Sequence, residues 1–178
     1  KKDITEFGTR NPGAANFSRE FGSKGAIAVF AGDLLTSFSV FTICLFAINK
    51  FASYGITHQI ILGYLILLGT FFPVFFKFKG GTGLAKFLGV SCAINPLSFI
   101  FIFPFILIVF YKTRNFAILG TVLVVLVTLS SAIVNYEYNI FPLSYSYPDM
   151  NGLYTLLACG LLVFIKGMHQ YKGHLFYD

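Results

Sequence analysis

Hydrophobic residues along this chain fall into five long stretches that short polar segments separate. These stretches run over approximately Gly25–Ile48, Ile60–Phe76, Leu84–Phe110, Phe116–Val134 and Leu153–Ile165. Runs such as Phe99–Phe103 are apolar at every position, whereas the strands of a transmembrane barrel alternate apolar and polar residues. Because a helical span needs roughly 20 apolar residues to cross a bilayer core, the pattern predicts an all-α, polytopic transmembrane helical bundle.

The third stretch contains Asn95–Pro96 near its middle. Proline removes a helix hydrogen bond and disfavours helical geometry in the preceding residue. We therefore expect a break here that divides the stretch into two short helices. Irregular backbone at membrane depth is tolerated only where protein buries it or where it lines a cavity.

Composition supports a membrane protein. Of the 178 residues, 56% are hydrophobic and 11% are charged, whereas soluble domains carry roughly 25% charged residues. The length suits one compact membrane domain over residues 1–178. The first 24 residues are polar and lack the order of a secretory signal, so we interpret them as a structured loop.

Basic residues form three clusters beside the apolar stretches. These clusters are Arg10, Arg19 and Lys24; Lys77, Lys79 and Lys86; and Lys112 with Arg114. Lysine and arginine collect in cytoplasmic loops. If the third stretch leaves and returns as two short elements, all three clusters face the cytoplasm and the Tyr136–Asp149 loop faces outward. A single crossing would instead separate the second and third clusters, so the charge pattern favours the first arrangement, with glycine-rich cytoplasmic loops.

The net charge of +6 does not indicate nucleic-acid binding, because no soluble basic domain presents these charges. Basic residues beside apolar spans point to anionic membrane lipids and to phosphorylated substrates.

The first segment that suits chemistry runs from Gly8 to Asn16 and is followed by Arg19. Small residues let backbone N–H groups converge on a ligand, and arginine grips a phosphate with two parallel hydrogen bonds. The segment therefore suits a phosphate. The alternative is an ordinary turn with an exposed arginine.

The second segment runs from Phe72 to Gly83 and leads into the apolar stretch at Leu84. A glycine-rich loop that precedes a helix directs N–H groups and the positive end of the helix dipole at a ligand, which favours an anion. The spacing of a nucleotide-binding P-loop is absent. The alternative is an interfacial turn whose lysines reach lipid phosphates.

Asp33 is the only acidic residue embedded in an apolar stretch. A carboxylate in the membrane usually meets a cation or lines a polar cavity, so Asp33 is expected to orient Arg10, Arg19 or a lysine unless it simply lies at the interface. The histidines and the three cysteines lack the spacing of a metal site. We therefore expect neither a metal nor another cofactor.

At these segments the sequence resembles the bacterial acyl-phosphate-dependent glycerol-3-phosphate acyltransferases. Gly8–Asn16 resembles the family pattern G-S-x-N-P-G-A-T-N, and Gly32–Asp33 matches its G-D pair. Phe72–Gly83 resembles F-P-x-F-x-x-F-K-G-G-K-G. The similarity covers roughly residues 4 to 95 and continues more weakly to about residue 165.

The resemblance implies a membrane acyltransferase of phospholipid synthesis in the bacterial inner membrane. Such an enzyme moves a fatty acyl group from acyl phosphate to glycerol 3-phosphate and makes lysophosphatidate. It also implies seven transmembrane helices, so the family's first helix is expected to be absent before Lys1. The roles that it implies are catalytic for Arg10, Asn16 and Lys79, orienting for Asp33, and phosphate-binding for Thr9, Asn11, Gly13, Arg19, Gly80, Gly81 and Gly83.

Several positions depart from the family pattern. Thr82 stands where the family has the second motif's lysine, and Lys86 follows four residues later, where it would face the same site if a helix starts near Gly83. The third family motif, H-R-x-N-I, is not recognisable in residues 166–172. These departures leave open a second interpretation, in which the chain is a catalytically inactive relative that serves as a lipid-binding or structural subunit of a membrane complex.

Overall fold

The computed structural model describes residues 3–8, 10–51, 56–113, 122–130, 133 and 150–175. Within these residues the chain is helical and contains no strand, which confirms the all-α prediction. Residues 122–130 are helical, and the named elements are η1 (Ile4–Glu6), α1 (Ala14–Phe21), α2 (Ser23–Phe51), α3 (Ile56–Phe71), η2 (Val74–Phe76), α4 (Leu84–Ile94), α5 (Pro96–Thr113) and α7 (Met150–Leu175).

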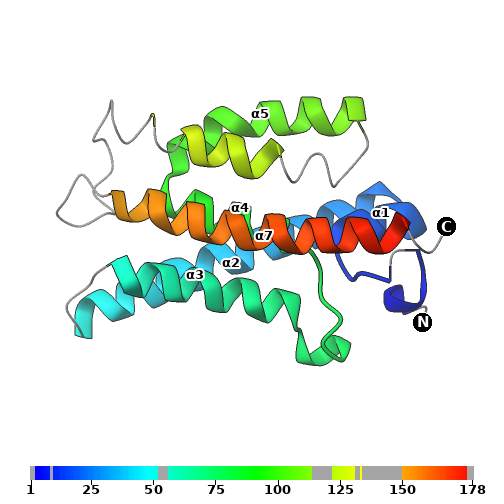
Figure 1. The fold of residues 1–178 in the computed structure, drawn as a ribbon, viewed down its shortest axis with the longest axis horizontal. Coiled ribbons are helices and arrows are strands. Elements are labelled where there is room, and N and C mark those ends of the chain that lie inside the picture. The colour runs from blue at the N-terminus through cyan, green and yellow to red at the C-terminus, as the bar shows by residue number, and fades with distance from the viewer. Residues whose placement is uncertain are drawn as a thin grey trace.

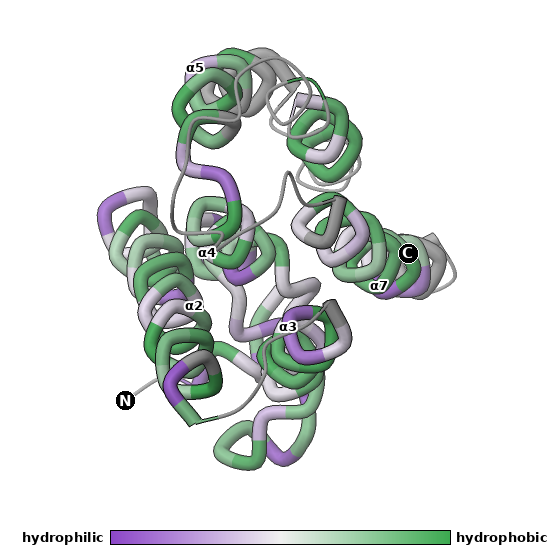
Figure 2. The backbone as a smooth tube through the Cα atoms, turned by 90° about the vertical axis from the view of Figure 1, so that its left-hand side faces the viewer, coloured by the Kyte–Doolittle hydropathy of each residue, from purple (hydrophilic) through white to green (hydrophobic). Residues whose placement is uncertain are grey.

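The short helix α4 lies in the middle of the bundle, with α2, α3, α5 and α7 arranged around it (Figure 2). Five consecutive residues of α4, from Phe87 to Ser91, are buried. Phe87 and Leu88 belong to a core cluster that also contains Leu67 of α3 and Leu156 of α7. The central helix therefore joins the surrounding helices through one apolar core.

Small residues let the helices approach closely. A methyl group at Gly89 of α4 would overlap the Ser37 hydroxyl of α2, and one at Gly63 of α3 would lie 2.6 Å from the Cys159 sulfur of α7. Packing of this kind is typical of helices in membranes, where small residues bring backbones together.

The outer surface of the bundle is apolar. Ile27, Ile43, Phe46, Leu65 and Phe101 are each at least 60% exposed, and soluble proteins rarely expose apolar patches on this scale. The segments Ser23–Ile48, Thr57–Phe76 and Gly152–His169 are long and apolar enough to cross a membrane. The protein is therefore a membrane protein.

The predicted break at Asn95–Pro96 is confirmed. Asn95 ends α4 with φ −144° and ψ 86°, its N–H donates to the Ser91 carbonyl at 2.8 Å, and α5 begins at Pro96. From the break, α5 runs back toward the end of the molecule at which α4 begins (Figure 1). This course agrees with a stretch that leaves and returns as two elements.

Two boundaries differ from the sequence-based expectation. The second apolar stretch continues to Phe76, but α3 ends at Phe71 and η2 follows, because Pro73 cannot continue the helix. The N-terminal segment was expected to be a loop, yet it contains α1. The rings of Phe17 and Phe21, one helical turn apart in α1, lie 4.8 Å from each other, and this spacing of apolar residues favours a helix.

The end of the molecule that carries α1 also carries the loop between α3 and α4 and the C-terminal end of α7 (Figure 1). The side chains of Lys112 and Arg114 and the Tyr136–Asp149 loop lie outside the described residues.

Candidate active site

The first glycine-rich segment forms a tight turn that leads into α1. Gly8 and Arg10 both have left-handed backbone geometry, with φ of 52° and 55°, and the Arg10 N–H donates to the Phe7 carbonyl at 2.9 Å. Gly13 then caps α1, and its N–H donates to the Asn11 side-chain oxygen at 3.2 Å. This turn leaves the Arg10 side chain exposed to solvent.

Asn16 lies beneath this turn and is only 1% exposed. Its side-chain amide donates to the backbone carbonyls of Ile4 at 3.2 Å and Phe7 at 2.9 Å. A methyl group at Gly8 would overlap the Asn16 side-chain oxygen. The amide of Asn16 therefore fixes the backbone of the turn that carries Arg10.

The second glycine-rich segment also contains unusual backbone geometry. Lys77 and Phe78 have φ of 51° and 63°, and the Lys79 N–H donates to the Phe76 carbonyl at 3.0 Å. Among the described residues, Arg10, Lys77 and Phe78 are the non-glycine residues with positive φ. Such geometry costs free energy and concentrates at functional sites, and within the described part of the chain these non-glycine residues lie only in the two segments that the sequence singles out.

Glycines shape the rest of this loop. Gly80 packs so closely on the end of α3 that a methyl group there would overlap the backbone carbonyl oxygen of Thr70. Gly83 precedes α4 with φ 77°, a conformation that glycine adopts readily. The loop is therefore held against α3 at one end and directed into α4 at the other.

The structure brings the two segments together. A methyl group at Gly81 would lie 3.0 Å from the Asn11 side-chain oxygen. Asp3 lies at the N-terminal end of the chain, and the N–H of Thr5 holds the pKa of its carboxyl below the usual value. The charges of Lys77 and Lys79, in the second segment, also lower this pKa weakly. The exposed cations Arg10, Arg19 and Lys79 thus lie on segments at the same end of the bundle.

Asp33 forms an ion pair with a lysine, which was one of the partners expected from the sequence. Its carboxylate lies 3.3 Å from the Lys86 ammonium, and both side chains are about one-third exposed or less. Lys86 belongs to the first turn of α4, directly after the glycine loop.

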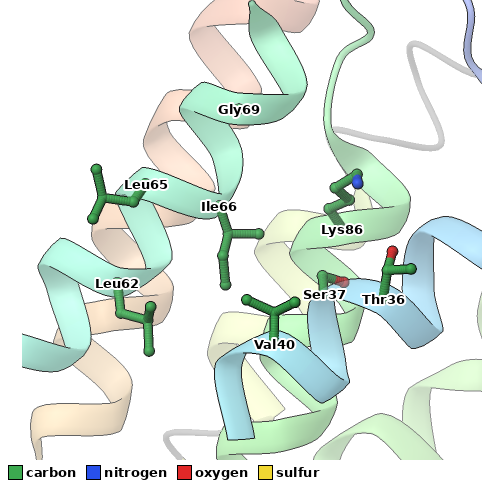
Figure 3. Close-up of a pocket in the computed structure, with 8 residues that line it drawn as sticks. All are labelled: Thr36, Ser37, Val40, Leu62, Leu65, Ile66, Gly69 and Lys86. Atoms are coloured by element: carbon green, nitrogen blue, oxygen red, sulfur yellow. The ribbon is translucent and has the colours of Figure 1, made fainter. Parts of the chain in front are cut away.

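Lys86 also lines a groove between α2, α3 and α4 with a volume of about 390 Å³ (Figure 3). Val40 of α2 and Leu62, Leu65 and Ile66 of α3 provide apolar walls, and Lys86 provides the charge. Sequence reasoning missed this groove, because its apolar residues resemble every other residue of the spans. Gly69 was a possible signal, since it interrupts the bulky side chains of its helix.

Other predicted features lie apart from this geometry. Thr9 lies outside the described residues. In place of the third family motif, α7 continues as a helix, and the Lys166 ammonium lies 5.7 and 5.2 Å from the ring centroids of Phe71 and Phe72. Among the described residues, no group of three or more His, Cys, Asp or Glu residues is placed to hold a metal ion.

Comparison with proteins of known sequence identifies relatives along most of the chain. A glycerol-3-phosphate acyltransferase from Enterococcus faecalis is 31% identical over 170 residues, which cover 96% of this chain and 74% of the relative. One from Finegoldia magna is 35% identical over 123 residues, which cover 69% of this chain and 59% of the relative.

Solved structures give the same result. The crystal structure of PlsY, an integral membrane glycerol 3-phosphate acyltransferase, in its glycerol 3-phosphate form has a TM-score of 0.76 and 27% identity, and the match covers 98% of this chain and 80% of PlsY. The glycerol-3-phosphate acyltransferase family model matches residues 1–174. The chain therefore belongs to the glycerol-3-phosphate acyltransferase family.

Proposed function

We propose that this protein is a membrane enzyme that transfers a fatty acyl group from an acyl phosphate to glycerol 3-phosphate and forms lysophosphatidate. The observation that carries the proposal is the meeting of two glycine-rich, basic segments beside an apolar groove, in a chain of this family. The structural relative was solved in its glycerol 3-phosphate form, which supports glycerol 3-phosphate as the acceptor.

In the proposed reaction, a hydroxyl oxygen of glycerol 3-phosphate attacks the acyl carbon. A new C–O ester bond forms, the bond between the acyl carbon and the phosphate oxygen breaks, and the hydroxyl proton ends on the released inorganic phosphate. Because acyl phosphate already carries a good leaving group, the protein mainly aligns two anionic substrates and stabilises negative charge. Exposed cations and backbone N–H groups supply that stabilisation without a covalent nucleophile.

Within this site we assign Arg10 and Lys79 to contact the reacting phosphates, with Arg19 and the N–H groups of the glycine loop as further donors. This assignment is supported by their exposure and by the left-handed backbone of Arg10 and of Phe78, which directly precedes Lys79. Asn16 is assigned to hold the turn, because its amide is already bonded to two backbone carbonyls.

We also propose that the protein lies in the bacterial inner membrane with both glycine-rich segments in the cytoplasm. Lys77, Lys79 and the basic residues of the N-terminal segment are carried at one end of the bundle. Concentration of lysine and arginine at one membrane face is typical of the cytoplasmic side. The same face would supply both water-soluble glycerol 3-phosphate and membrane-bound acyl donor.

The donor test uses the purified chain in detergent with glycerol 3-phosphate and either palmitoyl phosphate or palmitoyl coenzyme A. We expect lysophosphatidate from palmitoyl phosphate and at least tenfold less from the thioester, measured by mass spectrometry. Equal rates with both donors would contradict the assigned donor. Absence of product from a folded sample with either donor would contradict the enzyme and favour the inactive relative that Thr82 and the missing third motif suggest.

The apolar groove is the proposed place of the acyl chain, and Gly69 offers a probe of it. Gly69 lines the groove, and a methyl group there would meet no atom within 4 Å, so we expect the larger side chain of Gly69→Leu to enter the groove. We expect kcat/KM for palmitoyl phosphate to fall about tenfold, as expected for a poorly fitting hydrophobic pocket, while kcat/KM for a short acyl phosphate such as butyryl phosphate stays nearly unchanged.

Gly167 on α7 gives the matched control, because a methyl group there also meets no atom within 4 Å but Gly167 does not line the groove. Gly167→Leu should show the same dependence of kcat/KM on acyl-chain length as the wild type. An unchanged profile in Gly69→Leu would place the acyl chain elsewhere.

A further inference from the structure

Lys86 occupies an unfavourable position for a lysine. It lies in the first turn of α4, where the positive end of the helix dipole disfavours a cation, and it lines a groove whose walls are largely apolar. Ionisable residues inside membrane bundles are costly and usually functional. The ion pair with Asp33 at 3.3 Å offsets part of this cost, but an apolar pair of similar size would avoid it entirely.

The position of Lys86 relates it to the glycine loop. The loop has Thr82 where the resembled family pattern has lysine, and Lys86 follows by four residues. One helical turn spans about 5.4 Å, and a lysine side chain reaches over a distance of that order. Figure 3 shows Lys86 of α4 close to Thr36 and Ser37 of α2, and all three residues line the groove.

The hydroxyl hydrogens of Thr36 and Ser37 are directed at backbone carbonyls of α2. The Thr36 hydroxyl donates to the carbonyls of Gly32 at 2.7 Å and Asp33 at 3.1 Å, and the Ser37 hydroxyl donates to those of Asp33 and Leu34 at 2.9 Å. These bonds fix the α2 turn that carries the Asp33 carboxylate. The Asp33 carboxylate holds Lys86 from one side, and 26% of the Lys86 side chain is still exposed.

We propose that Lys86, held by Asp33, replaces the lysine that the glycine loop lacks at Thr82 and binds the phosphate of the acyl donor at the polar end of the groove. Asp33 is a positioning residue in this arrangement, because it acts through Lys86. The inference rests on the proposed function for the identity of the ligand. It differs from the family pattern in the position of the cation along the chain.

The decisive experiment moves the lysine back into the loop. Lys86→Ala should raise KM for palmitoyl phosphate at least tenfold, and Thr82→Lys added to Lys86→Ala should recover at least tenfold in kcat/KM. Lys50→Ala removes an exposed lysine in the last turn of α2 and should behave as wild type. Thermal unfolding in detergent checks that each variant is folded, and Lys86→Met replaces Lys86→Ala if alanine prevents folding.

The positioning role of Asp33 has its own readout. Asp33→Asn should raise KM for palmitoyl phosphate in the wild-type background but should have no further effect in the Thr82→Lys, Lys86→Ala background, because no lysine remains at position 86 to be oriented. A purely structural role of Asp33 would lower activity equally in both backgrounds and would overturn this part of the inference.

The outcomes separate the inference from the proposed function. An active wild type whose Lys86→Ala variant keeps its KM, or is not improved by Thr82→Lys, overturns the inference and leaves the acyltransferase assignment intact. An inactive wild type overturns the proposed function. Lys86 is then tested by the binding of palmitoyl phosphonate, which is measured as a shift in the unfolding temperature of the protein. A shift that is lost in Lys86→Ala and regained with Thr82→Lys supports the inference, and an unchanged shift overturns it.

Discussion

Replacement of Arg10 with alanine is expected to lower kcat/KM for lysophosphatidate formation by about 10²–10³-fold, the effect of removing one donor that stabilises developing negative charge. The side chain is exposed, so its loss should not disturb the core. The backbone of Arg10 is left-handed with φ 55°. Alanine also carries a Cβ atom, so the cost of this geometry is the same in the variant and the wild type.

Two controls separate the charge of Arg10 from its shape. Arg10→Lys keeps the charge but loses the paired donors that hold a phosphate, and it should be intermediate in kcat/KM. Lys24→Ala removes an exposed cation from the first turn of α2 and should be nearly silent. Turnover of Arg10→Ala within twofold of wild type, with an unchanged unfolding temperature, would remove Arg10 from the site.

The sequence predicts those features of the fold that depend on local rules. The break at Asn95–Pro96 follows from the missing N–H of proline and appears where expected. The helix α1 was missed, because the polar and glycine-containing composition around it conceals the spacing of Phe17 and Phe21. Their rings form a contact that only becomes evident in the folded helix.

For the site, the sequence indicates the two segments but not how they meet. The approach of Gly81 to Asn11 depends on the packing of α4 between α2 and α3, which no local pattern specifies. The partner of Asp33 was likewise open among several cations, and the crossing of α2 and α4 at Gly89 places Lys86 beside it. Long-range packing thus determines which of the candidate residues become neighbours.

The packing of the glycine loop on the end of α3 depends strongly on Gly80. A methyl group at this position would overlap the Thr70 carbonyl oxygen and lie close to the Phe71 carbonyl, both at the end of α3. Backbone atoms inside a helix end cannot move aside as a side chain does, so Gly80→Ala must displace the loop instead. Because Lys79 is the adjacent residue and misplacement by about 1 Å costs roughly 10² in rate, we expect kcat/KM to fall at least 10²-fold.

Three glycines provide a graded comparison for this prediction. In Gly81→Ala the new methyl group meets the end of the Asn11 side chain at 3.0 Å, which can shift, so the loss should be smaller than in Gly80→Ala. Gly167→Ala enters open space within α7 and should keep full activity with an unfolding temperature at or above that of wild type, because alanine favours a helix over glycine by about 0.5–1 kcal/mol. Measurement of kcat/KM and of unfolding temperature in detergent ranks the three variants. Activity of Gly80→Ala equal to that of Gly167→Ala would show that close packing of the loop on α3 does not control the position of Lys79.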